Sequence, residues 1–229
     1  MEFRQIHIDE TGSTNQWLRD RQEEDDVCVV ADFQTAGRGC GTNTWESERG
    51  KNLTFSLLLH PVMMPARQQF VISKAVSVAL CKVLSRYAAG FSIKWPNDIY
   101  WSDRKIAGIL IENRLQGSFV KDSIIGIGLN VNQSVFLSDA PNPVSLCQIT
   151  GCDIDREALL CEILRQLDLS VLPDDYGSML YRQQGFHAYS DAEGNFEAEL
   201  IEVEPDGHLV LRTREGDVRR YAFKEVRFC

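Results

Sequence analysis

The sequence predicts an α/β domain followed by a small β-rich domain. Short apolar, β-branched runs with the length of strands alternate with two longer segments, 65–87 and 154–172, whose apolar residues recur at helical spacing. Towards the C-terminus, polar and apolar residues alternate in short runs separated by turn sequences such as Pro205-Asp206-Gly207. We place the boundary so that residues 1–182 form the first domain and residues 183–229 the second.

Each expected element follows from a local pattern. Residues 5–9 have the character of a strand, and Ser13 and Gln16 have the spacing of a capping box that opens a helix over 15–21. We expect further strands over 27–33, 53–59, 93–95, 106–112 and 124–128, helices over 65–87 and 154–172, a break over 185–195, and C-terminal strands over 196–203, 208–214 and 218–223. The last three suggest a small β-barrel, and a domain of roughly 45 residues buries little core alone, so we expect it to pack on the first.

Composition and charge exclude several classes of protein. The chain has 229 residues and a net charge of −9, which disfavours general nucleic-acid binding because that affinity comes mostly from phosphate neutralisation. No apolar run has the length of a membrane span, and the N-terminus has no apolar signal core. The seven cysteines form no Cys-x-x-Cys pair, which disfavours a disulfide framework and a zinc ribbon. We therefore expect a cytoplasmic protein that contacts neither membrane nor DNA.

A glycine-rich loop follows the second expected strand. Gly37, Arg38 and Gly39 combine free backbone amides, a close approach of the main chain and a planar cation suited to carboxylate or phosphate. Trp45 could close over an apolar or ring-shaped ligand. A plain surface loop is the alternative, and the phosphate-binding P-loop pattern is absent here.

Two lysines frame the next candidate segment, Lys94-Trp95-Pro96-Asn97-Asp98 followed by Lys105. Lys105 stands at the start of a strand directed to the core, where an unpaired cation is costly to bury, and Gly108 leaves room for a ligand against that strand. The alternatives are a lysine that extends to solvent and an Asn97-Asp98 pair that only braces its own turn. Asn130, after Gly126-Ile127-Gly128-Leu129, could bind a base or a ribose or could form a turn.

Taken in order, these segments resemble biotin protein ligases. The resemblance runs from about Ser13 to the C-terminus. The motifs that carry it are Ser13-Thr14-Asn15, Gln34-Thr35-Ala36-Gly37-Arg38-Gly39, Trp45, Lys94-Trp95-Pro96-Asn97-Asp98, Arg104-Lys105-Ile106-Ala107-Gly108-Ile109 and Gly126-Ile127-Gly128-Leu129-Asn130. It implies a mixed-sheet catalytic domain and an SH3-like β-barrel domain. It also implies two half-reactions, in which biotin and ATP give biotinyl-5′-AMP and the biotinyl group then passes to a lysine of a biotin carboxyl carrier domain.

The resemblance also implies roles for individual residues. It implies that Lys105 contacts both biotin and phosphate, and because attack of a carboxylate on a phosphate brings two anions together, we expect Lys105, Arg38 and Lys94 to be the catalytic cations. Biotin would be bound by Ser13, Thr14, Asn15, Gln34, Gly37, Arg38, Gly39, Cys40, Trp45, Lys105 and Gly108. ATP would be bound by Arg38, Trp45, Lys94, Asn97, Lys105 and Asn130. Independently of the resemblance, the phosphate chemistry leads us to expect Mg²⁺ between the phosphates, with Asp98 as its candidate ligand and capping of its own turn as the alternative role of that carboxylate.

The chain departs from the family pattern in two places. The Ser-Thr-Asn motif already begins at Ser13, which leaves no room for the DNA-binding domain of some members, so we expect a ligase without repressor function. In the glycine loop, Cys40 and Asn43 stand where bacterial members often carry arginines, which weakens the expected grip on the adenylate phosphate or shifts it to Arg49 and Lys51.

Two other functions compete with this interpretation. A lipoate ligase or octanoyltransferase shares the catalytic fold, but the Arg-rich Gly-Gly-Gly loop and the His-Asp pair of that class are missing. A non-catalytic module that binds biotin or a nucleotide is the second, and the paired cations disfavour it. The sequence leaves the oligomeric state open, with a homodimer through sheet edges as one outcome.

Overall fold

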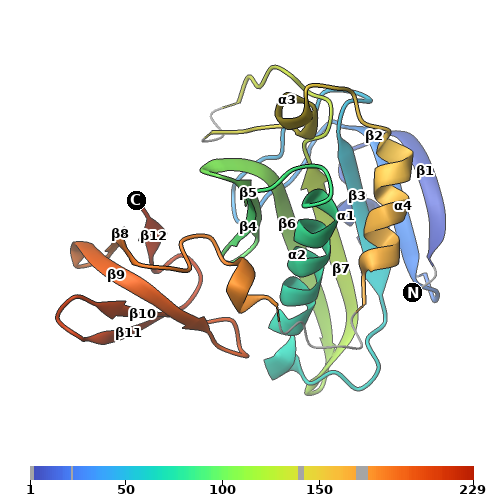
Figure 1. The fold of residues 1–229 in the computed structure, drawn as a ribbon. Helices are drawn as coiled ribbons and strands as arrows, with labels where there is room; N and C mark the ends of the chain where they lie inside the picture. Colours follow the sequence, from blue (N-terminus) through green and yellow to red (C-terminus); the bar gives the residue numbers. More distant parts are fainter. Residues whose placement is uncertain (1–2, 22, 139–141, 169–174) are drawn as a thin grey trace.

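A mixed sheet forms the larger part of the molecule (Figure 1). The computed structural model describes residues 3–21, 23–138, 142–168 and 175–229. Seven strands run in the order β1-β2-β3-β7-β6-β5-β4, with β1 parallel to β2 and every other neighbouring pair antiparallel. They are β1 (Arg4–Thr11), β2 (Val27–Gln34), β3 (Leu53–Leu59), β4 (Phe91–Lys94), β5 (Asp98–Trp101), β6 (Arg104–Gln116) and β7 (Phe119–Leu129). The predicted α/β fold with a mixed sheet is confirmed.

Helices cover both faces of this sheet. α2 (Phe70–Leu84) and α4 (Arg156–Gln166) lie on one face, and the short α1 (Thr14–Arg19) lies on the other (Figure 1). The remaining helical segments are η1 (Ala66–Gln68), α3 (Leu146–Thr150) and η2 (Gly177–Met179). Within the described part of the chain, no helix is long and apolar enough to cross a membrane.

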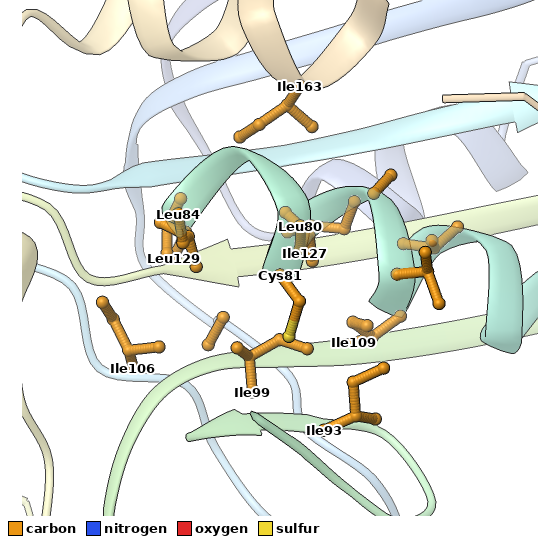
Figure 2. Close-up of a cluster of buried hydrophobic side chains, with 14 of the residues drawn as sticks. Leu80, Cys81, Leu84, Ile93, Ile99, Ile106, Ile109, Ile127, Leu129 and Ile163 are labelled. Atoms are coloured by element: carbon orange, nitrogen blue, oxygen red, sulfur yellow. The ribbon is translucent and has the colours of Figure 1, made fainter. Parts of the chain in front are cut away.

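The alternation of side chains along β7 separates the core from the opposite face. Ile125, Ile127 and Leu129 are buried towards α2, whereas Gly126 and Gly128, one residue out of phase, belong to the other face. Figure 2 shows the core side of this arrangement, where Leu80, Cys81 and Leu84 of α2 meet Ile106, Ile109, Ile127 and Leu129 of the sheet. The face that carries the glycines is the one on which α1 lies, and Asn15 of α1 packs against Gly126.

The C-terminal residues form a second, antiparallel sheet. Its strands are β8 (Phe186–Asp191), β9 (Gly194–Val203), β10 (Leu209–Thr213), β11 (Val218–Tyr221) and β12 (Arg227–Phe228). Their order is β11-β10-β9-β8-β12, so among the described residues no pairing joins β12 to β11 and the sheet stays open. A small β-rich C-terminal unit is confirmed, but the closed barrel is not formed, because β12 has only 2 residues and pairs with β8 alone.

The second sheet packs on the first, as its size led us to expect. The indole Nε1 of Trp95 donates a hydrogen bond of 2.9 Å to the carbonyl oxygen of Gly207, and Lys74 Nζ donates one of 2.9 Å to the carbonyl of Val203. Gly207 lies so close to Phe70 that a Cβ there would come within 2.7 Å of the ring. Trp95 of the Lys-Trp-Pro-Asn-Asp segment thus joins the two sheets.

Several local predictions are corrected by the structure. Ser13 is the N-cap of α1, but its side chain makes no capping bond and Gln16 bonds Asp20 instead, so the capping box is wrong. The expected helix over 65–87 is shorter, because Pro65 leads into a 3₁₀ turn before α2. Residues 185–195 are not a break, since they carry all of β8 and the start of β9. The helix expected over 154–172 ends at Gln166, and residues 169–172 lie outside the described part.

Candidate active site

A hydrogen-bond network of buried polar side chains begins at the N-terminus of α1. Ser13, Thr14 and Asn15 are 6%, 3% and 3% exposed, which is unusual for a polar triplet. The amide and hydroxyl of Thr14 donate to Gln34 Oε1 over 2.8 and 3.1 Å, and Ser56 Oγ donates to Asn15 Oδ1 over 2.6 Å. These bonds fix the end of β2 against α1 and β3. The hydroxyl of Ser13 makes no such bond among the described residues and faces the adjoining cavity.

The same network reaches a carboxylate and two arginines. Asn15 Nδ2 donates to Glu112 Oε2 over 2.8 Å, and Glu112 forms ion pairs with Arg19 and, over 3.4 Å, with Arg38. Burial opposes ionisation of Glu112, but the hydrogen bonds from Arg19 and Asn15 and the charges of both arginines outweigh it, so the pKa of Glu112 is lowered. Arg38 of the glycine loop is therefore held by Glu112, and Glu112 is in turn held by Asn15 and Arg19.

A pair of glycines seats the indole of Trp45. Gly108 on β6 and Gly128 on β7 are direct cross-strand partners on the face away from α2. A Cβ on Gly128 would lie 2.2 Å from Trp45 Cε2, and one on Gly108 would lie 3.2 Å from Trp45 Cζ3. Gly126 makes the same kind of room for Asn15, whose Oδ1 would be 2.3 Å from an added Cβ. The absence of side chains at these positions is what allows the site to form.

The glycine loop is folded back on itself. Trp45 N donates to the carbonyl of Gly37 over 3.0 Å, and Gly39 N donates to the carbonyl of Asn43 over 2.8 Å. The carbonyl of Trp45 occupies the place of a Gly37 side chain, since a Cβ there would meet it at 2.5 Å. The loop follows β2 as predicted, and its backbone fixes Trp45 over the sheet.

Cys40 of this loop lies against the turn that contains Asn97. Asn97 Nδ2 donates to the carbonyl of Ile109 over 2.8 Å and to Cys40 Sγ over 3.2 Å. Burial, followed by the charge of Asp98, raises the pKa of the Cys40 thiol. A protonated thiol suits a lining residue better than a nucleophile. The Asn97 amide therefore joins its turn to β6 and to the glycine loop, and does not only brace its own turn.

Two lysines stand near one carboxylate. Lys105 Nζ lies 2.7 Å from Asp98 Oδ1 and 5.8 Å from the centre of the Trp45 ring. Lys94 Nζ donates to the hydroxyl of Tyr100 over 3.0 Å, and burial lowers the pKa of Lys94 against the opposing charge of Asp98. Burial and the Asp98 charge raise the pKa of Tyr100 to about 12, so its hydroxyl stays protonated. Asp98 begins β5, a strand that the sequence did not predict.

Two cavities meet at Trp45 and Lys105. The first has a volume of about 230 Å³ and the second about 640 Å³. Both are lined by Asn43, Thr44, Trp45, Asp98 and Lys105. Trp45 is half-buried, and its Nε1 is enclosed against the sheet with no hydrogen-bond partner among the described atoms. A ligand in each cavity would therefore meet the other beside Lys105.

The structure distributes the predicted site residues between these cavities. The first is lined by Ser13, Thr14, Asn15, Gln34, Arg38, Gly39, Cys40, Trp45, Asn97, Asp98, Lys105 and Gly108. The second is lined by Trp45, Lys94, Asp98, Lys105 and Asn130. Gly37 lines neither and lies beside Trp45. Arg38 and Asn97, which were expected to bind ATP, thus face the first cavity rather than the second.

Sequence reasoning missed residues that reach the site from a distance. Phe223, in the turn after β11, lines the first cavity, and Phe136 lines the second. Glu46 accepts backbone hydrogen bonds from Leu137 and Ser138, among them one of 2.7 Å from Ser138 N, and so holds the segment that carries Phe136. None of these has a local sequence signal, since each depends on contacts between remote segments.

The chain is similar to known proteins in both sequence and fold. The model of the biotin/lipoate A/B protein ligase family matches residues 4–130. A bifunctional ligase/repressor BirA of Bacillus spizizenii is 32% identical over 94% of the chain and 70% of its own length. A biotin–[acetyl-CoA-carboxylase] ligase of Mycobacterium tuberculosis is 30% identical over 74% of the chain and 65% of its own length. The structure of a biotin protein ligase from Aquifex aeolicus in complex with biotin and ATP superposes with a TM-score of 0.80 at 26% identity, covering 98% of this chain and 99% of that one. The chain belongs to the biotin/lipoate A/B protein ligase family.

Proposed function

We propose that the chain is an ATP-dependent biotin protein ligase, which makes biotinyl-5′-AMP and transfers the biotinyl group to a lysine of a biotin carboxyl carrier domain. The observation that carries this proposal is the pair of cavities that share Lys105, Asp98 and Trp45. A reaction that joins two ligands needs two compartments that meet at one set of reacting atoms. The curated relatives named as biotin ligases and the ligase structure with biotin and ATP support the same assignment.

The first cavity suits biotin. It combines apolar walls with a few placed polar groups, among them the Ser13 hydroxyl and the Thr14–Gln34 pair, which fit the ureido ring. The second cavity, with Lys94 and Asn130 on its walls, suits ATP. In this arrangement the biotin carboxylate and the α-phosphate approach each other at the junction of the two.

The chemistry brings two anions together. A carboxylate oxygen of biotin attacks the α-phosphorus of ATP, and the bond to the bridging oxygen breaks to release pyrophosphate. Lys105 stabilises the developing negative charge, with Lys94 on the nucleotide side and Arg38 on the biotin side. The carrier lysine amine then attacks the acyl carbon, and AMP leaves with the bonding electron pair while the amine loses its proton.

Mg²⁺ is expected with the nucleotide, to which it would be bound mainly by phosphate oxygens and water. Two carboxylates line the second cavity, Asp98 and Glu46. Glu46 already accepts backbone hydrogen bonds, and Asp98 is bound to Lys105. Asp98 is thus the residue that would hold the ion, by exchanging Lys105 for it, and the ion would neutralise phosphate charge.

Incubation with ATP, biotin and a carboxylase carrier domain, read by streptavidin blot, tests the proposal. We expect ATP-dependent labelling of the carrier and none of a carrier whose acceptor lysine is replaced by arginine. Labelling with lipoate in place of biotin would instead favour a lipoate ligase. Binding of biotin without transfer, measured by calorimetry, would favour a non-catalytic binding module.

A further inference from the structure

Three aromatic rings surround the ammonium group of Lys94, which lines the second cavity. Lys94 Nζ lies 4.5 Å from the ring centre of Tyr100, 5.4 Å from that of Phe228 and 6.0 Å from that of Tyr181. A cation within about 6 Å of a ring centre is attracted by the negative face of the ring. Tyr100 belongs to β5 of the first sheet, whereas Phe228 belongs to β12 of the second. Both sheets thus contribute to the surroundings of one charge.

These rings act on Lys94 in the place of a carboxylate. Asp98, the carboxylate whose charge acts on Lys94, is bound to Lys105 over 2.7 Å. Burial lowers the pKa of Lys94, so its charged form needs a stabilising neighbour. A carboxylate would stabilise that form but would also neutralise it. A ring carries no net charge, so the positive charge of Lys94 stays available to an anion in the cavity.

The backbone around β12 fixes the ring of Phe228. Phe228 lies opposite Tyr189 in the pairing of β12 with β8, and the two ring centres are 5.1 Å apart. The next residue, Cys229, donates its N–H to the carbonyl of Ala188 over 3.1 Å, and its main-chain oxygen accepts a hydrogen bond of 2.6 Å from Arg182 Nη2. Phe228 cannot turn away from Lys94 without loss of these contacts. The short strand that leaves the second sheet open therefore presents a ring to the first.

We propose that Phe228 is a positioning residue for nucleotide binding, whose ring holds the ammonium group of Lys94 towards the phosphates of ATP. This inference rests on the proposed function, since it takes ATP as the ligand of the second cavity. The hydroxyl of Tyr100 accepts one N–H of Lys94 over 3.0 Å, which leaves further N–H groups of the lysine for phosphate oxygens. The C-terminal unit thereby takes part in binding the nucleotide without contacting it.

Replacement of Phe228 by leucine tests this, because leucine keeps an apolar side chain and removes the ring face. Biotin-dependent release of pyrophosphate is measured with ATP varied at saturating biotin, and then with biotin varied at saturating ATP. We expect Phe228→Leu to raise the KM for ATP about threefold to tenfold. The KM for biotin should be unchanged, because neither Lys94 nor any of the three rings lines the first cavity. Phe228→Tyr, which restores a ring face, should have a KM for ATP within about twofold of the wild-type value.

Phe196→Leu is the matched control. Phe196 is also a partly buried ring of the second sheet, stacked on Tyr189 at 6.0 Å and on Tyr221 at 6.1 Å. It lines neither cavity of the candidate site. We expect Phe196→Leu and Phe228→Leu to lower the urea midpoint of unfolding by similar amounts, and only Phe228→Leu to change the KM for ATP.

A second comparison asks whether Phe228 acts through Lys94. Phe228→Leu is combined with Lys94→Met, which keeps an unbranched stem and removes the charge. Affinity for ATP is measured by calorimetry without biotin, so that the comparison does not depend on turnover. We expect Phe228→Leu to weaken ATP binding when Lys94 is present and to have no effect in the Lys94→Met background.

An unchanged KM for ATP in Phe228→Leu would overturn the inference, because Lys94 would then be held without this ring. Equal increases in the KM for ATP and for biotin, or the same increase in Phe196→Leu, would show a general disturbance of the site. An equal loss of ATP affinity with and without Lys94 would show that the ring acts by another route. A wild type that releases no pyrophosphate with biotin and ATP would refute the proposed function as well, whereas normal wild-type release with any of the other outcomes refutes this inference alone.

Discussion

Gly128→Ala is expected to displace Trp45 from the sheet. Neither Gly128 nor its cross-strand partner Gly108 has a positive φ, so the backbone accepts alanine at both positions. The two positions differ in the distance between an added Cβ and the indole of Trp45. The new Cβ at Gly128 would lie 2.2 Å from Trp45 Cε2 and 2.6 Å from both Cδ2 and Nε1, far inside the usual carbon contact of about 3.5–4.0 Å.

The indole would have to move by roughly 1 Å or more, which resembles overpacking a core and costs about 1–3 kcal/mol of unfolding free energy. Urea unfolding of the wild type, Gly128→Ala, Trp45→Ala and the double variant measures this as a double-mutant cycle. We expect Gly128→Ala to be destabilising only while Trp45 is present. Its adenylation rate should also fall, by on the order of 10²-fold, because a displacement of that size misplaces the reacting groups.

Gly108→Ala is the matched control. Its Cβ would lie 3.2 Å from Trp45 Cζ3, which a shift of a few tenths of an ångström relieves, so we expect a loss below about 1 kcal/mol. The reasoning is refuted if Gly128→Ala has the same cost with and without the indole.

Three further substitutions test other contacts of the site. Gly126→Ala should displace Asn15, whose Oδ1 would be 2.3 Å from the new Cβ, and urea unfolding should show a loss of about 1–3 kcal/mol; an unchanged midpoint would contradict the placement of Asn15. Trp95→Phe removes the hydrogen bond to the carbonyl of Gly207 and should lower the unfolding free energy by about 1 kcal/mol, whereas no change would show that this bond does not help to dock the second sheet. Because the folded-state pKa of Glu112 is lowered, its contribution to stability is present above the unfolded value of about 4.3 and is lost as the pH falls through the folded value. Glu112→Gln should therefore have a flatter acid limb of stability against pH than the wild type, and parallel limbs would refute this.

Much of the sheet could be predicted because its strands carry strong local patterns. The run Ile124-Ile125-Gly126-Ile127-Gly128-Leu129 is apolar and β-branched, and β7 does include it. Of the glycines on β6 and β7, only Gly108 was expected to leave room for a ligand. Gly108 and Gly128 lie opposite each other, and the indole of Trp45 packs on both. This arrangement depends on the register of β6 and β7, which sequence patterns do not specify.

The segment from Lys94 to Asp98 shows where local reasoning stops. A proline and an Asn-Asp pair favoured a turn, and the turn is present, but Asp98 also begins β5. β5 pairs with both β4 and β6, so tertiary pairing overrides the local signal. The role of Trp95 in docking the second sheet could not be predicted either, because its partner lies 112 residues further along the chain.

No sequence pattern predicted that the turn between β11 and β12 would reach the site. Phe223 and Lys224 stand in an exposed stretch with no motif, and only the packing of the two sheets brings them to the glycine loop. The alternation of the C-terminal strands predicted the small β-rich unit correctly. It could not show that β12 would be too short to close a barrel.

The central claim is that Lys105, where the two cavities meet, stabilises the attack of a carboxylate on a nucleotide phosphate. Biotin-dependent release of pyrophosphate from ATP, compared between the wild type and Lys105→Ala, tests it most directly. The account predicts release from the wild type and a loss on the order of 10²–10³-fold or more in the variant, with the circular dichroism spectrum of the fold retained. Near-normal release of pyrophosphate by Lys105→Ala would contradict it.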